Sequence, residues 1–140
     1  MTDGGPRKGE GARSRLPRAA RITTTEEIRT LFRRGKRRKT RHLDVFVSTS
    51  PVVHCRIAIV VPKPRGDAGG GRIRAAAVRR NRLKRRLREI ARASVLPELN
   101  GRDCRVDVLV RARPEAYGAT FGELRAELLD VEEWLCSHRG

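Results

Sequence analysis

The most chemically distinctive stretch of this 140-residue chain is a run of arginines between residues 72 and 92. It contains ten Lys or Arg residues and one acidic residue, Glu89. A planar guanidinium can donate two parallel hydrogen bonds to a phosphate, and the Asn81 amide can reach a 2′-hydroxyl, a base edge or a metal-bound water. We therefore predict nucleic-acid binding by eight polar side chains: Arg79, Arg80, Asn81, Arg82, Lys84, Arg85, Arg88 and Arg92.

Helical spacing predicts how these side chains are positioned. At about 100° per residue, a hydrophobic stripe occupies one face of a helix from about Ala75 to Val95, which Pro97 should end. The stripe consists of Leu83, Leu87, Ile90 and Ser94, and the opposite face carries Asn81, Arg85, Arg88 and Arg92. The alternative is a solvated helix held by i,i+4 ion pairs. It is disfavoured because Glu89 is almost the only possible acidic partner and the like charges repel one another.

The charge of the chain is large and uneven. Lys and Arg number 33 against 16 Asp and Glu, a formal net charge of +17. Residues 1–95 hold 27 basic and 7 acidic residues, whereas residues 96–140 hold 6 and 9. A localised basic surface of this kind is typical of nucleic-acid binding, because an ordinary solvated surface mixes both signs.

The elements around the arginine run can be placed by their patterns. Residues 1–15 are expected to form a disordered basic tail. Thr24 and Glu27 predict a capping box at the start of a helix that Gly35, which is free to take a positive φ, should end, followed by a basic loop at 36–39. Alternating residues predict strands at 43–47, 55–61 and 105–111, and a Gly-rich loop at 66–71 precedes the arginine helix.

A second capping box at Thr120 and Glu123 predicts a final helix. The predicted order is therefore α-β-β-α-β-α, an α/β (α+β) two-layer sandwich in which three main helices pack on a small mixed sheet. Residues 16–140 are expected to form a single RNA-binding domain.

From Ala77 to Glu89, the arginine helix closely resembles the signature helix of the bacterial ribonuclease P protein family. The signature is Arg80-Asn81-Arg82, continued by Lys84-Arg85 and Arg88. Weaker similarities extend over residues 16–135: the segment from Arg21 to Gly35, Phe46 on the first strand, the strand ending Arg111-Ala112-Arg113, and the final helix from Tyr117.

The resemblance implies a fold and a function. The family's fold is an α/β sandwich with a left-handed crossover through the signature helix. Its members bind a catalytic RNA and help it remove the 5′ leader of precursor tRNA. The chain would thus be the non-catalytic protein subunit of a ribonucleoprotein endoribonuclease. The catalytic groups and the Mg²⁺ ions would belong to the RNA, and no protein partner would be required.

The resemblance also implies a cleft for the leader. A single strand of variable sequence requires stacking surfaces and a basic lining. We expect Phe32 and Phe46 to stack, and Arg56 and Lys63 to contact phosphates, although core packing is an equal alternative for both aromatic residues. The chain departs from the family pattern at Ile28, where many members have an aromatic residue, and in a Gly-rich insertion at 66–75.

Other chemistries are poorly supported. His42, His54, Cys55 and Cys104 lack the spacing of a zinc site, so a buried Cys55 thiol is favoured. The three cysteines form no evident disulfide framework. Together with the absence of a membrane or signal segment, this favours a reducing cytoplasm.

Two alternative functions remain. A structural RNA-binding protein of the ribosome would have similar composition, and only the signature helix argues against it. A stand-alone, metal-dependent endonuclease would need carboxylates such as Asp44 and Asp107, but no paired-carboxylate or Ser-His-Asp arrangement emerges from the sequence.

Overall fold

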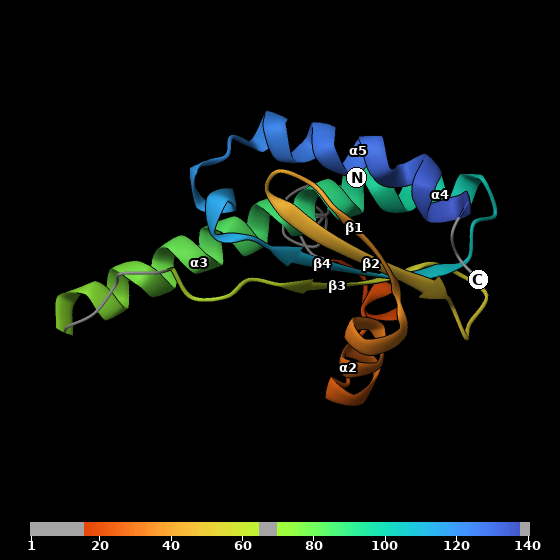
Figure 1. The fold of residues 1–140 in the computed structure, drawn as a ribbon, viewed down its shortest axis with the longest axis horizontal. Helices are drawn as coiled ribbons and strands as arrows, with labels where there is room; N and C mark the ends of the chain where they lie inside the picture. The colour runs from red at the N-terminus through yellow and green to blue at the C-terminus, as the bar shows by residue number, and fades with distance from the viewer. Residues whose placement is uncertain (1–15, 65–69, 138–140) are drawn as a thin grey trace, which may run out of the picture.

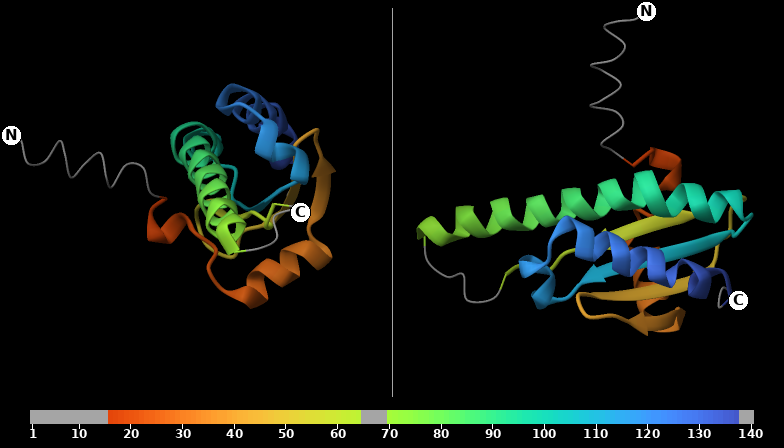
Figure 2. Two further views of the ribbon diagram at one scale, coloured as in Figure 1. Left: turned by 90° about the vertical axis from the view of Figure 1, so that its left-hand side faces the viewer. Right: turned by 90° about the horizontal axis from the view of Figure 1, so that it is seen from above.

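The computed structural model describes residues 16–64 and 70–137. The predicted tail at 1–15 and residues 65–69 of the predicted insertion lie outside the described residues. The chain forms a mixed four-stranded sheet in the order β1-β2-β4-β3. Helices α3 and α5 lie side by side on one face, and α2 crosses the other (Figures 1 and 2). The predicted α/β sandwich with a small mixed sheet is confirmed.

The sheet contains one strand that the sequence did not predict. Strand β1 (Lys36–Lys39) falls where a basic loop was expected. It pairs antiparallel with β2 (Leu43–Thr49), and all four of its residues are exposed. A strand that is exposed on both faces shows no alternation of apolar and polar residues, so the pattern on which the prediction relied is absent.

The other strands agree with the predicted alternation. Strand β4 (Val106–Ala112) lies between β2, which is antiparallel to it, and β3 (Arg56–Val60), which is parallel. Buried hydrophobic residues form two clusters, one on each face of the sheet. Those of the larger cluster, which include Val45, Ile57 and Val108, point toward α3 and α5. Those of the smaller cluster, which include Phe46, Ala58 and Leu109, point toward α2. Because both faces of the sheet are covered, β2 and β4 are buried along most of their length.

The parallel strands β3 and β4 are joined through the arginine helix. Helix α3 (Gly70–Ile90) begins earlier than predicted, so residues 70–75 are helical rather than part of a loop. Pro97 does not end the helix: a π-helical turn (Ala91–Val95) leads into α4 (Leu96–Gly101), and Pro97 lies in the first turn of α4. The wider turn accommodates the proline, which lacks the N–H that a regular helix would require there.

The π-helical turn also changes which residues continue the buried stripe. The Leu96 N–H donates to the Ala91 carbonyl, five residues back. Ala91 and Val95 are buried, whereas Ser94, which was predicted in the stripe, is partly exposed and accepts a hydrogen bond from Arg125 at 3.2 Å. The extra residue in the turn rotates the following side chains relative to the α-helical spacing.

Both capping predictions are confirmed at the helix starts. The Glu27 N–H donates to the Thr24 hydroxyl at 3.3 Å at the start of α2 (Thr25–Arg34). Thr120 and Glu123 exchange two such bonds, of 2.8 and 3.1 Å, at the start of α5 (Phe121–Ser137). Two short 3₁₀ helices complete the chain: η1 (Arg18–Ala20) and η3 (Pro114–Gly118).

Gly35 ends α2, but for a different reason from the one predicted. Its φ is −66°, so the freedom of glycine to take a positive φ is not used here. A Cβ at this position would lie 2.6 Å from the Leu31 carbonyl oxygen and 3.3 Å from Phe46 Cβ. The absence of a side chain thus allows α2 to turn directly into β1.

We predict that Gly35→Ala lowers the free energy of unfolding by about 1–3 kcal/mol, because the added methyl group has no room beside the Leu31 carbonyl. Urea denaturation of the two proteins measures the difference. Gly101→Ala is the matched control, since a Cβ at Gly101 meets nothing within 4 Å. Equal stability of the two variants would contradict the tight approach at Gly35.

Candidate nucleic-acid interface

Helix α3 presents its arginines in the directions that the sequence predicts. Leu83, Leu87 and Ile90 are 3%, 0% and 0% exposed, so the apolar face is fixed in the core. The opposite face is turned to solvent and carries Asn81, Arg85 and Arg88, and Arg82 is exposed on the flank beside them. Among the described residues, these four side chains have no hydrogen-bond or ion-pair partner. We call them the outward ladder.

One predicted member of this surface has a structural role as well. The Arg80 Nε donates to the Val61 carbonyl at 2.8 Å, which ties α3 to the end of β3. The neighbouring Lys84 is partly buried, and burial, aided by the charges of Arg80 and Arg88, lowers its pKa. Arg80, which was predicted only as a nucleic-acid contact, therefore also holds part of the fold together.

At the C-terminal end of the predicted surface, the charge of Arg92 is neutralised by an acidic neighbour. Both ends of the Arg92 guanidinium bind the Glu89 carboxylate, at 2.5 and 3.2 Å. Arg92 is thus less available to a phosphate than Arg85 or Arg88.

The other flank of α3 carries a feature that the sequence analysis missed. Arg79, Arg82 and Arg86 line a small pocket of about 110 Å³ together with Tyr117 of η3. The Tyr117 hydroxyl donates to the Pro62 carbonyl at 2.6 Å, and the Arg79 guanidinium lies 5.2 Å from the Tyr117 ring. Arg86 was not predicted, although its spacing of four from Arg82 places both on one flank of the helix.

The two aromatic residues predicted for the leader cleft lie on the side of the sheet that α2 crosses. Phe32 and Phe46 contact each other edge to face, with 5.1 Å between ring centroids. Phe32 is 37% exposed but Phe46 only 7%, so Phe32 offers the accessible ring and Phe46 supports it from below. Lys63, the fourth predicted member, is exposed beyond β3.

Arg56 is not the free cation that a phosphate contact requires. It donates two hydrogen bonds to Asp107, at 3.0 and 2.7 Å, and one to Glu27 at 2.8 Å. Its pKa is raised, chiefly by the bonds to Asp107. The hydrogen bonds from Arg56 and Thr24 hold the pKa of Glu27 below its usual range. Arg56 therefore links β3, β4 and α2.

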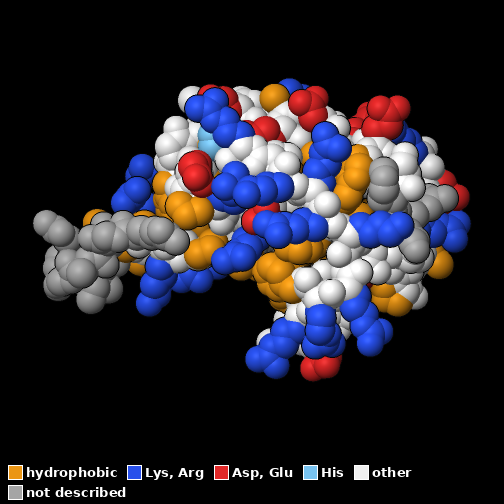
Figure 3. Space-filling model, in the orientation of Figure 1, with side chains coloured by type: hydrophobic (Ala, Val, Ile, Leu, Met, Phe, Trp, Pro, Cys, Tyr) orange, Lys and Arg blue, Asp and Glu red, His pale blue; other side chains and the backbone are white. Residues whose placement is uncertain are grey.

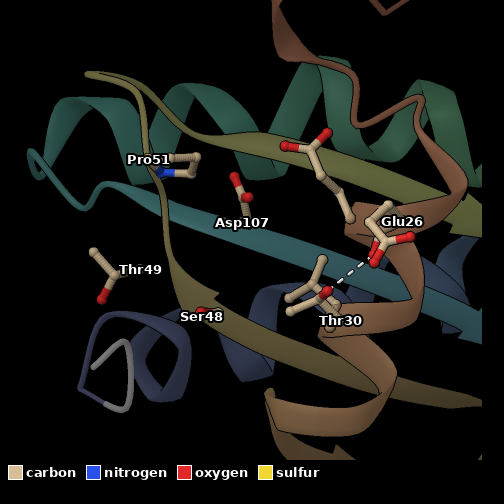
Figure 4. Close-up of a pocket in the computed structure, with 8 residues that line it drawn as sticks. Glu26, Thr30, Ser48, Thr49, Pro51 and Asp107 are labelled. Carbon is tan, nitrogen blue, oxygen red and sulfur yellow. Dashed lines mark hydrogen bonds between the residues drawn. The ribbon is translucent and has the colours of Figure 1, made fainter.

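The carboxylates around Arg56 border a pocket of about 260 Å³ (Figure 4). It lies between the first turns of α2 and the end of β2, where Ser48, Thr49 and Pro51 line it. Glu26 and Glu27 enter from α2, and Asp107 from β4. Within the described residues this pocket has more negative than positive charge, which disfavours an RNA backbone.

Several other polar and sulfur-containing groups are engaged in structural contacts. Within residues 16–64 and 70–137, no group of three or more His, Cys, Asp or Glu residues could hold a metal ion. Asp44, considered above for a metal-dependent nuclease, binds Arg37 at 3.1 Å. His42 is paired with Glu127, which also accepts from the Thr40 hydroxyl at 2.6 Å.

The cysteines correct one expectation. Cys104 and Cys136 form a disulfide with a Cα–Cα distance of 5.5 Å, although the sequence suggested no pairing. Cys55 is a buried free thiol, as predicted; it donates to the Cys104 carbonyl, and burial raises its pKa. No helix among the described residues is long and apolar enough to cross a membrane.

The fold and its surfaces define a small, strongly basic α/β domain with an arginine-rich helix exposed along one side. Residues 16–133 match the family model for Ribonuclease P. The "Ribonuclease P protein component" of Acidothermus cellulolyticus is 37% identical over 80% of this chain and 84% of its own length. That of Micrococcus luteus is 40% identical over the same shares.

Solved structures show the same fold. The ribonuclease P protein of Staphylococcus aureus covers 84% of this chain and 95% of its own with a TM-score of 0.62 at 22% identity. That of Thermotoga maritima covers 81% and 96% with a TM-score of 0.57 at 22% identity. The chain belongs to the ribonuclease P protein family.

We predict that Arg56→Ala lowers the free energy of unfolding by about 3–5 kcal/mol, because it leaves the carboxylate of Asp107 buried without its partner. The Asp107 side chain is only 9% exposed. Arg105→Ala, which breaks the exposed pair with Asp103, should cost less than about 1 kcal/mol. Chemical denaturation compares the two; a similar small loss for both would show that Arg56 is dispensable for folding.

Proposed function

We propose that this chain is the protein subunit of a ribonuclease P ribonucleoprotein. In this proposal it binds the catalytic RNA and the 5′ leader of precursor tRNA, and assists removal of the leader to give the mature tRNA 5′ end. The RNA supplies the catalytic groups and holds the Mg²⁺ ions, and the protein acts in the cytoplasm without a further protein partner. Family membership supports the general role.

The outward ladder is the observation that carries this proposal. Three guanidiniums and one amide project from a helix whose other face is locked in the core, and no described acidic residue pairs with them. The like charges of such a surface repel one another when no ligand is bound. Binding of a polyanion removes this repulsion and is therefore favourable. Because the apolar face of the helix is buried in the core, the backbone positions from which these side chains project are set before RNA arrives.

The division of labour follows from the chemistry of the described residues. The carboxylates that a metal-dependent protein nuclease would use, Asp44 and Asp107, are bound to arginines. The protein's contribution is therefore positioning and charge neutralisation, which allows the RNA to fold and bind substrate at lower Mg²⁺. In this proposal, exposed Phe32 offers a stacking surface to a leader base, and exposed Lys63 offers a charge to its backbone.

A reconstitution experiment tests the proposal. Purified protein is mixed with a bacterial ribonuclease P RNA and a precursor tRNA at low Mg²⁺, and 5′ processing is followed on gels. We expect cleavage only when RNA and protein are both present, and none by RNA-free protein. Cleavage by the protein alone would favour a protein nuclease, and copurification with ribosomal subunits would favour a ribosomal role.

Substitutions on α3 separate RNA binding from folding. We predict that Asn81→Ala and Arg85→Ala each weaken binding of the catalytic RNA by about 1–3 kcal/mol, the range for hydrogen bonds involving charged groups. Both should leave the melting temperature nearly unchanged, because both side chains face solvent. Arg80→Ala should lower it, since the bond to Val61 is lost. Filter binding and thermal denaturation measure the two effects; destabilisation by Arg85→Ala would contradict the assigned face.

A further inference from the structure

The face of the sheet that α2 crosses has opposite charges at its two ends. Strand pairing places the residues of this face in rows across the sheet. One row contains Ser48, Asp107 and Arg56, next to the acidic pocket. The middle row contains Arg37, Phe46, Leu109 and Ala58, and the last contains Lys39, Asp44, Arg111 and Val60.

The ion pairs in and beside these rows show which charges remain unpaired. At the first row, Glu26, Glu27 and Asp107 face one cation, Arg56, which is fully occupied by two of them. At the last row, Asp44 is the only acid and binds Arg37 at 3.1 Å. Lys39 and Arg111 are exposed there, and neither has an ion-pair partner among the described residues.

The two ends are far enough apart to act separately. Asp107 and Arg111 are four residues apart on β4, or about 13 Å at the usual strand rise of about 3.3 Å. This exceeds the screening length of about 8 Å at physiological ionic strength. A polyanion on this face would therefore be repelled at one end and attracted at the other.

The cationic end adjoins the exposed aromatic ring. The Arg111 guanidinium lies 5.9 Å from the centroid of Phe32, and that of Arg37 lies 5.8 Å from the centroid of Phe46. Sites for single-stranded nucleic acid combine a stacking ring with cations that follow the backbone. Figure 3 shows Lys and Arg side chains across the part of the surface where β1 lies.

We propose that Lys39 and Arg111 bind backbone phosphates of the single-stranded leader whose base stacks on Phe32. The leader then runs from Phe32 toward the β1 edge and avoids the acidic pocket. This inference rests on the proposed function, and it assigns the phosphate contacts to residues other than Arg56.

Protection of an edge strand is the competing explanation for the charges on β1, because lysines on an exposed edge prevent pairing with other chains. That explanation accounts equally for Lys36 and Arg38, which point to the opposite face of the sheet. It does not account for Arg111, which lies on the internal strand β4 and projects into the same row as Lys39.

The test compares two double variants in the reconstituted complex of protein and catalytic RNA. Lys39→Ala/Arg111→Ala removes the proposed contacts, and Lys36→Ala/Arg38→Ala removes the same charge from the other face of β1. Each complex is titrated with precursor tRNA carrying a long leader, with the same precursor carrying a leader of one or two nucleotides, and with mature tRNA. Circular dichroism confirms folding, and Lys39→Gln/Arg111→Gln, which keeps longer side chains, replaces the first variant if its spectrum changes.

We expect the Lys39/Arg111 variant to bind the long-leader precursor about three- to tenfold more weakly, the range for two exposed charge contacts. Its affinity for mature tRNA should be unchanged, and the slope of log affinity against log salt should become shallower by about 0.7 for each lost contact. The Lys36/Arg38 variant should match the wild type with all three ligands.

Other outcomes overturn the inference in distinguishable ways. Equal losses in both double variants would reduce the effect to net charge. Weaker assembly with the catalytic RNA, without dependence on leader length, would assign the row to that RNA. Aggregation with unchanged RNA affinities would leave edge protection as the explanation. Failure of the proposed function itself would appear separately, as a lack of 5′ processing by the wild-type complex.

Discussion

The buried stripe of helix α3 is the constraint on which the other features depend. Leu87 and Ile90 have no exposed surface, and Leu83 has almost none. Burying three such side chains contributes several kcal/mol, on the order of 1.5–3 kcal/mol each. This burial fixes the rotation of the helix about its axis, and the rotation decides which arginines face solvent and which face the protein.

The same rotation gives the arginines of one helix three different roles. Those opposite the stripe form the outward ladder. Arg80, on the flank next to β3, holds the end of that strand by its carbonyl, and Arg86, on the other flank, lies against η3. The π-helical turn then allows the helix to continue past Pro97, so that Leu96 and Leu99 of α4 extend the same core.

Two partly buried charged residues each link several secondary-structure elements. Arg56 joins two strands and α2, and Glu127 joins α5 to the β1–β2 turn through Thr40 and His42. Burial raises the pKa of Glu127, but the hydrogen bonds from Thr40 and His42 outweigh it and leave the pKa below its usual range. Near the disulfide, Glu132 has a buried oxygen with no partner among the described residues, and burial raises its pKa.

The sequence by itself determined the elements whose signals are local. Helical spacing in α3, alternation in β2, β3 and β4, and the two capping boxes each depend on residues a few positions apart, so they could be recognised without tertiary contacts. The outward direction of Asn81, Arg85 and Arg88 followed from the same spacing.

The tertiary structure decided what depends on residues far apart in the chain. Strand β1 exists only because β2 pairs with it, and Gly35 is required by the approach of Leu31 and Phe46. The pairing of Cys104 with Cys136 needs the end of α5 to reach the start of β4. Arg56 was predicted as a free cation because its partners lie 29 and 51 residues away, at Glu27 and Asp107. A charge in a sequence reveals its sign and spacing, but only the fold shows whether another charge has already neutralised it.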